Sequence, residues 1–163
     1  MKTLLVIHHS ITDGARQMAQ AALEGAMGES NIAVVGLHAA EAAHEDLLEA
    51  DGYIFATPEN LASMAGVMKD FFDRSYYPLL DQIQGRPYAT MICAGSDGTG
   101  AARQIARIAT GWRLKPIAEP LIIITGAQTS EAIAAPKIIS ANELARCEEL
   151  GATFAAGLAA GIF

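Results

Sequence analysis

Five apolar runs rich in β-branched residues recur along the chain, and each is followed by a segment with the hydrophobic spacing of a helix. The runs are continuous rather than alternating, which is typical of strands that are buried on both faces of a parallel sheet. They occupy residues 3–7, 32–37, 53–56, 88–94 and 116–125. The pattern therefore predicts five parallel strands joined by helices.

Apolar residues between these runs recur at intervals of three and four, as they do on the buried face of a helix. Three such faces start at Ala15, Met64 and Ala101, and further helices are expected at residues 40–49 and 142–158. Strict alternation of strand and helix demands right-handed crossovers and a sheet covered on both sides. We therefore expect a three-layer α/β/α architecture.

The end of the chain carries two further local signals. Ser140 followed three residues later by Glu143 resembles a capping box, which would start the last helix. Residues 126–139 are too long for a tight turn and mixed in composition, so we expect a loop near the edge of the functional site.

Length and composition indicate one domain, residues 1–163. The chain has 163 residues, of which 52% are hydrophobic and 18% are charged, so it is able to bury a sizeable core. Its formal net charge of −7 would repel nucleic acids and anionic membrane surfaces. We therefore expect no nucleic-acid partner.

Cysteine usage and targeting signals bear on the compartment. Cys93 lies in a strand-like run and Cys147 in a helix-like run, and their spacing does not fit a zinc site, so both are expected to be buried free thiols. No apolar run reaches the ~18 residues of a membrane span, and the N-terminus lacks the features of a signal peptide. A cytoplasmic location is the resulting expectation.

The chemistry is expected at the carboxyl ends of the strands, where ligands bind in open parallel sheets. Directly after the first strand, Ser10, Thr12 and Gly14 precede a helix N-terminus, so hydroxyls, backbone N–H groups and a positive dipole end meet at one place. That combination suits a phosphate. The loop has no Lys, and Arg16 already lies in the helix, so neutral donors would hold the phosphate.

Two more loops at this edge suit a flat heterocycle. After the third strand, Pro58 stiffens a loop in which Asn60 and Ser63 offer polar groups to the edge of a ring. After the fourth strand, the glycines at residues 95–100 let the backbone approach a thin ligand closely. One phosphate loop and two ring loops describe a mononucleotide site.

These motifs resemble the flavodoxin-like superfamily, and within it the NAD(P)H-dependent FMN reductases and NAD(P)H:quinone oxidoreductases. The resemblance covers nearly the whole chain. It implies a flavodoxin-like five-stranded parallel sheet in the order 2-1-3-4-5 with FMN at the carboxyl end. The motifs that carry it are Ser10-x-Thr12-x-Gly14, then Thr57-Pro58-x-Asn60-x-x-x-Met64-x-Gly66-x-x-Lys69-x-Phe71-x-Asp73-Arg74, then the Gly-Ser-Thr loop at 95–100.

The resemblance also implies function. It indicates a flavoprotein that takes a hydride from NADH or NADPH and passes electrons to a quinone or similar acceptor, with no catalytic side chain and no metal. The alternatives are a flavodoxin-like electron carrier and a flavodoxin-fold protein that has lost FMN. Apolar, Ala-rich helix faces would permit a homodimer. Cofactor-binding residues implied by the resemblance are Ser10, Thr12, Asp13, Gly14, Ala15, Pro58, Glu59, Asn60, Leu61, Ala62, Ser63, Gly95, Ser96, Asp97 and Gly98.

Each loop also has a purely structural interpretation. Ser10 and Thr12 would then form an ordinary cap and turn, Ser63 would cap a helix that begins at Met64, and Ser96 or Thr99 would cap the following helix.

Several residues outside the loops also admit more than one interpretation. His8 and His9 are neighbours on a strand end, so they are expected to point to opposite faces and not to chelate one ion. Met64, Met68, Phe71 and Phe72 fit a core or a subunit interface, while Lys69 and Asp73 fit an exposed pair. Tyr76 and Tyr77 would face either a substrate or a partner subunit.

Overall fold

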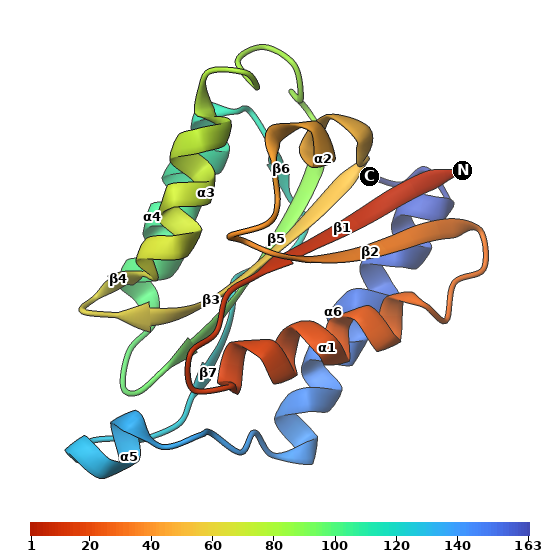
Figure 1. The fold of residues 1–163 in the computed structure, drawn as a ribbon. Helices are drawn as coiled ribbons and strands as arrows, with labels where there is room; N and C mark the ends of the chain where they lie inside the picture. Colours follow the sequence, from red (N-terminus) through yellow and green to blue (C-terminus); the bar gives the residue numbers. More distant parts are fainter.

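A computed structural model describes all residues, 1–163, and shows strands and helices alternating along the chain (Figure 1). Its elements are β1 (Lys2–His8), α1 (Gly14–Ala26), β2 (Ile32–His38), α2 (His44–Glu49), β3 (Gly52–Asn60), β4 (Ser63–Met64), α3 (Gly66–Tyr76), β5 (Pro87–Ala94), α4 (Thr99–Gly111), β6 (Lys115–Pro116), β7 (Leu121–Ile124), α5 (Ser130–Ala134) and α6 (Ala141–Ala159).

The sheet has the predicted strand order. β1 lies between β2 and β3, and β5 pairs with the other side of β3, all in parallel. Both β6 and β7 pair in parallel with β5, so together they occupy the place of the fifth predicted strand. β4 is the exception, because it turns back and pairs antiparallel with the end of β3.

The fifth predicted strand is interrupted rather than continuous. β6 pairs with the first residues of β5, and β7 pairs with the last ones, with residues 117–120 between them. Pro120 has no backbone N–H to donate to a strand ladder, and Pro116 likewise, so prolines flank the gap. The prediction of one strand over residues 116–125 was therefore wrong in its extent.

The prediction that every strand is buried on both faces was wrong at the two edges. β3 and β5 are almost wholly buried, but Val35 in β2 is 38% exposed and Ile124 in β7 is 49% exposed. An edge strand lacks a neighbour on one side, so helices cover it less completely. Only the central strands meet the expectation.

Two hydrophobic cores, one on each face of the sheet, make the three predicted layers (Figure 1). α2, α3 and α4 pack on one face, with Leu47, Phe71 and Ile105 fully buried there. α1 and α6 lie side by side on the other face, where Met18 and Phe154 are fully buried. This confirms the α/β/α architecture.

Several of the smaller expectations hold. Met64, Met68, Phe71 and Phe72 all belong to the first core, and both cysteines are buried free thiols. The exposed Lys69 and Asp73 form an ion pair at 2.7 Å.

The helix ends are partly as predicted. Ser140 caps α6 by accepting from the backbone N–H of Glu143 at 3.3 Å. α2 begins at His44, later than expected. In the turn before it, the carbonyls of Ala39 and Ala42 accept from the Arg74 guanidinium at 2.8 and 3.0 Å instead of from helical N–H groups. None of the helices combines the length and the apolar character that a membrane span requires.

Candidate functional site

The loops that follow β1, β3, β5 and β7 meet around one cleft at the carboxyl edge of the sheet. Eight of the predicted cofactor-binding residues line it: Ser10, Thr12, Gly14, Ala15, Pro58, Glu59, Asn60 and Gly95. Five residues that the sequence did not indicate line it as well: Cys93, Thr125, Ala127, Ile133 and Lys137. The predicted convergence of three loops at this edge is therefore present, and a fourth loop joins them.

The loop after β1 presents a run of free backbone donors. From Ser10 to Arg16, no backbone N–H group has an acceptor within the protein. α1 begins at Gly14 with Asp13 as its N-cap, and Asp13 makes no capping bond with its side chain. Free N–H groups and the positive end of the helix dipole together favour an anion.

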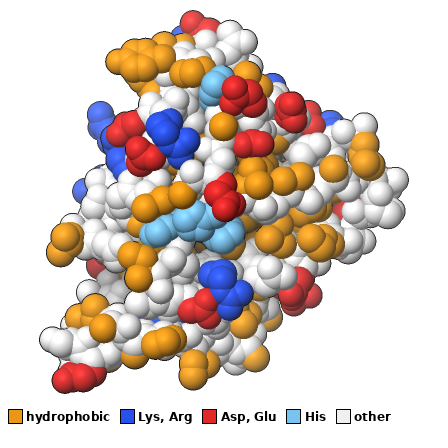
Figure 2. All heavy atoms as spheres, in the orientation of Figure 1, with side chains coloured by type: hydrophobic (Ala, Val, Ile, Leu, Met, Phe, Trp, Pro, Cys, Tyr) orange, Lys and Arg blue, Asp and Glu red, His pale blue; other side chains and the backbone are white.

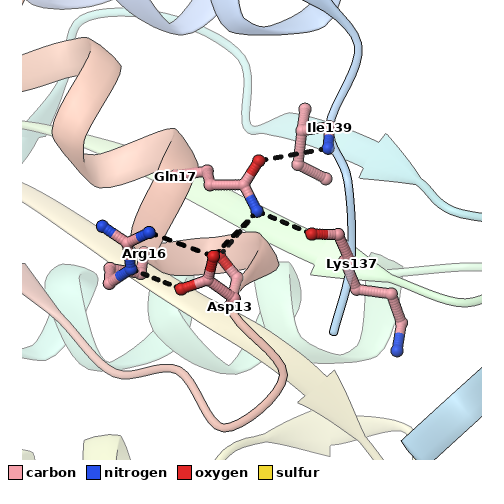
Figure 3. A network of polar contacts seen from close by, with 5 residues as sticks. All are labelled: Asp13, Arg16, Gln17, Lys137 and Ile139. Carbon is pink, nitrogen blue, oxygen red and sulfur yellow. Dashed lines mark hydrogen bonds and ion pairs between the residues drawn. The ribbon is translucent and has the colours of Figure 1, made fainter. Parts of the chain in front are cut away.

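Asp13 does not place an uncompensated charge beside these donors. Its carboxylate binds the Arg16 guanidinium and accepts from the Gln17 amide at 3.1 Å (Figure 3). The hydrogen bond from Arg16 lowers the pKa of the Asp13 carboxyl below its usual value. The alternative in which Ser10 or Thr12 caps α1 was wrong, since the N-cap position belongs to Asp13.

Glu59 caps the second helix N-terminus at this edge. One oxygen of its carboxylate accepts from the N–H of Gly98 at 2.8 Å, and the other accepts from the N–H of Ala101 at 3.1 Å. The predicted structural alternative, a cap from Ser96 or Thr99, was therefore wrong. Since α4 already holds a carboxylate, α1 is the helix N-terminus that remains open to a ligand anion.

The end of the β3 loop turns away from the cleft into a hairpin. Leu61 and Ala62 form its tip with φ of 53° and 61°, and they do not line the cleft. Ser63 lies in β4, where its hydroxyl donates to the Gln104 side chain at 2.9 Å. The alternative that Ser63 caps a helix starting at Met64 was wrong, because α3 begins at Gly66. Binding by these three residues stays a prediction.

The loop after β5 is only partly at the cleft. Gly95 lines it, and a Cβ atom at this position would lie 3.1 Å from the carbonyl oxygen of Ala127. Ser96 and Asp97 are exposed, and the Asp97 carboxylate accepts from the Thr99 hydroxyl at 2.8 Å. Gly98 is the N-cap of α4 with φ of 87°. Contact of Ser96, Asp97 and Gly98 with a cofactor stays a prediction.

Of the residues that the sequence missed, Cys93 and Thr125 had a detectable signal. Each lies near the carboxyl end of a predicted strand, where ligands of such sheets bind. Burial raises the pKa of the Cys93 thiol, and the Lys137 ammonium offsets part of that effect. Cys93 therefore stays a neutral thiol near neutral pH.

Lys137, Ala127 and Ile133 come from the last predicted loop, which contains the short helix α5. The length and position of residues 126–139 were the only hints that this segment borders the site. No local signal in the sequence indicated Lys137, because the contacts that fix its backbone at the site are with Thr12 and Gln17, more than a hundred positions away.

Three histidines gather where β1 and β2 end, and histidine side chains form a patch on the face shown in Figure 2. The rings of His8 and His9 both meet His38 edge-on, with centroids 5.7 and 5.2 Å from it. The expectation of opposite faces was wrong, because the chain leaves the strand after His8. No group of three or more His, Cys, Asp or Glu residues is arranged to hold a metal ion.

Because of these histidines, we expect the folding stability of the protein to decrease at mildly acidic pH. Burial, and then the charge of His38, lowers the pKa of both His8 and His9 below 6.5. The unfolded state therefore binds more protons just below pH 6.5, so stability is complete above that pH and declines as pH falls through this window. We expect the Tm to fall as the pH is lowered from about 6.5 to about 5.5, before most carboxylates titrate.

Thermal unfolding of two variants checks this origin. The double variant His8→Asn, His9→Asn is expected to show a shallower decline of Tm with falling pH than the unaltered protein. His44→Asn is the matched control, because His44 lies outside the cluster at the start of α2. An equal slope in the double variant and the unaltered protein would show that other groups cause the decline.

The fold and the cleft define a doubly wound α/β protein with a ligand site at the carboxyl edge of its sheet. Residues 30–128 match the NADPH-dependent FMN reductase family. The chain belongs to that family.

Individual relatives agree with this assignment. The chain is 33% identical over 108 residues to a flavodoxin of Aquifex aeolicus, covering 65% of this chain and 56% of that protein. It is 35% identical over 95 residues to an NAD(P)H dehydrogenase (quinone) of Acidithiobacillus ferrooxidans, covering 46% of this chain and 48% of that protein. It thus spans about half the length of these relatives. A solved flavodoxin from the domain Archaea superposes with a TM-score of 0.77 at 18% identity, covering 96% of this chain and 98% of that one, which shows the flavodoxin-like fold.

Proposed function

We propose that this chain binds FMN in the cleft and acts as an NAD(P)H-dependent oxidoreductase. The observation that carries the proposal is the contrast between the two helix N-termini at the site. The N–H groups from Ser10 to Arg16 are free, whereas those at the start of α4 bind Glu59. The start of α1 therefore has free donors for a dianion, whereas the donors at the start of α4 are already occupied. Membership of the NADPH-dependent FMN reductase family supports FMN as the ligand.

The residues of the cleft divide between the two parts of FMN. Ser10, Thr12 and the backbone of Gly14 would hold the phosphate by neutral donors. Pro58 and Asn60 would lie along the edge of the isoalloxazine ring, and Gly95 would allow its close approach.

The reactive chemistry would come from the bound flavin, which accepts a hydride from NAD(P)H and passes electrons on. Neither Glu59 nor Cys93 is suited to acid–base work in the cleft, because the Glu59 carboxylate is occupied by two N–H groups and burial raises the pKa of the Cys93 thiol. The chain would therefore bind and orient the reactants and leave one side of the ring accessible.

A quinone or similar small molecule is the proposed electron acceptor. The name of the Acidithiobacillus ferrooxidans relative supports a quinone. The proposed location is the cytoplasm, and formation of a homodimer stays a prediction.

A second candidate function is single-electron transfer between proteins. The similarity to the Aquifex aeolicus flavodoxin favours it, as does the net charge of −7, which would steer the chain toward basic partners. The two functions differ in turnover, because a carrier needs a separate reductase before it oxidises NAD(P)H.

Titration of the purified protein with FMN, followed by flavin fluorescence, tests the proposal. We expect saturable quenching, and then oxidation of NADH or NADPH in the presence of FMN and a quinone. Quenching without oxidation would favour the electron carrier. Absence of saturable quenching would contradict FMN binding and with it both functions.

A further inference from the structure

The segment after β7 is fastened across the phosphate loop. We call residues 127–139 the strap. The N–H of Lys137 donates to the Thr12 carbonyl at 2.7 Å. The Gln17 side chain donates to the Lys137 carbonyl at 2.7 Å (Figure 3). The N–H of Ile139 donates to the same Gln17 side chain at 3.2 Å. The backbone on both sides of Lys137 is therefore fixed to the loop and to α1.

This anchoring places the Lys137 side chain over the phosphate loop. A Cβ atom built on Gly14 would lie 3.5 Å from both Cβ and Cγ of Lys137, so the stem of the lysine packs against Gly14. Lys137 lines the cleft together with Ala127 and Ile133 of the strap. Its ammonium donates to the carbonyls of Ala132, Ile133 and Ala135 at 2.9, 2.8 and 2.6 Å, which holds it beside the cleft.

Lys137 is the one cationic side chain among the residues that line the cleft. The nearby Arg16 is bound to Asp13, and the other charged lining residue is Glu59. The chain as a whole carries a net charge of −7. A phosphate dianion in the cleft would therefore depend on Lys137 for opposite charge.

We propose that Lys137 is the specificity residue for the phosphate, so that the site selects FMN over riboflavin. When the phosphate binds, the Lys137 ammonium would give up some of its hydrogen bonds to the carbonyls of residues 132–135 and donate to phosphate oxygens instead. The backbone of the strap would stay bound to Thr12 and Gln17. Lys137 would add one charged donor to the neutral donors that are expected to hold most of the phosphate. The proposal rests on the proposed function, because it takes FMN as the ligand.

The test compares affinities for FMN and riboflavin, measured by quenching of flavin fluorescence. Lys137→Gln removes the charge and keeps N–H donors for the α5 carbonyls. We expect it to weaken FMN binding by about tenfold or more, the loss typical of one charge-assisted hydrogen bond, and to leave riboflavin binding unchanged. Lys137→Arg is expected to restore most of the FMN affinity.

Lys115→Gln is the matched control, because Lys115 is exposed in β6 and pairs with the first residue of β5, at the opposite end of the strand from the cleft. It is expected to change neither affinity. Equal weakening of both ligands by Lys137→Gln would overturn the proposal, since the strap would then have only a structural role. Unchanged FMN affinity would overturn it as well.

The same titrations distinguish a failure of the Lys137 proposal from a failure of the proposed function. If the unaltered protein binds FMN and Lys137→Gln binds it equally well, the role of Lys137 fails and the proposed function stands. If the unaltered protein binds neither FMN nor riboflavin, the proposed function fails and the role of Lys137 fails with it.

Discussion

Replacing Gly14 by alanine is expected to weaken FMN binding by about tenfold to a hundredfold, as overpacking of 1–3 kcal/mol would. The added Cβ would lie 2.5 Å from the Sγ atom of Cys93, closer than real contacts allow. Cys93 is 7% exposed in the buried strand β5, so its sulfur has little room to move. The phosphate loop must shift instead, which displaces the N–H groups that would bind the phosphate.

A double-variant comparison isolates this contact. Cys93→Ala removes the sulfur, so Gly14→Ala combined with Cys93→Ala is expected to recover most of the lost affinity relative to Cys93→Ala alone. Titration with FMN measures all four proteins. If the double variant binds FMN as weakly as Gly14→Ala does, the clash with Cys93 is not the cause.

Replacing Gly151 by alanine is expected to reduce the free energy of unfolding by about 3 kcal/mol, at the upper end of the usual cost of overpacking. α1 and α6 approach closely here: a Cβ on Gly151 would lie 1.9 Å from the carbonyl oxygen of Ala22. Gly25 on α1 meets the carbonyl of Glu148 in the same way, at 2.0 Å. These are backbone atoms, so relief requires the two helices to separate.

Urea denaturation of Gly151→Ala measures this cost. Gly111→Ala is the matched control, because Gly111 is also helical and a Cβ there meets nothing within 4 Å. It is expected to be neutral or to stabilise by up to about 1 kcal/mol through lower chain entropy. If both substitutions change the free energy of unfolding equally, α1 and α6 separate at Gly151 without the expected cost.

The arrangement of the sheet was predictable because its signals are local. Continuous apolar runs marked the strands, and helical spacing between them required parallel pairing. The break between β6 and β7, by contrast, depends on how far a strand can continue past Pro116 and Pro120. Exposure of Val35 and Ile124 depends on which strands lie at the edge, and hydrophobic pattern alone does not tell an edge strand from a central one.

The candidate site was predictable to the extent that it consists of strand ends. Ser10, Thr12 and Gly14 were found because they directly follow a strand and precede a helix. The contacts of Glu59 and Lys137 were missed because they join segments that are far apart in the sequence. Glu59 binds Gly98 and Ala101, about forty residues away, and Lys137 binds Thr12 at the opposite end of the chain.

A crystal structure of the protein with FMN tests the central claim most directly. The account predicts the phosphate at the start of α1, within hydrogen-bond distance of the N–H groups between Ser10 and Arg16, with the ring beside Pro58 and Asn60. A phosphate bound elsewhere, or FMN absent from this cleft at saturating concentration, would contradict it.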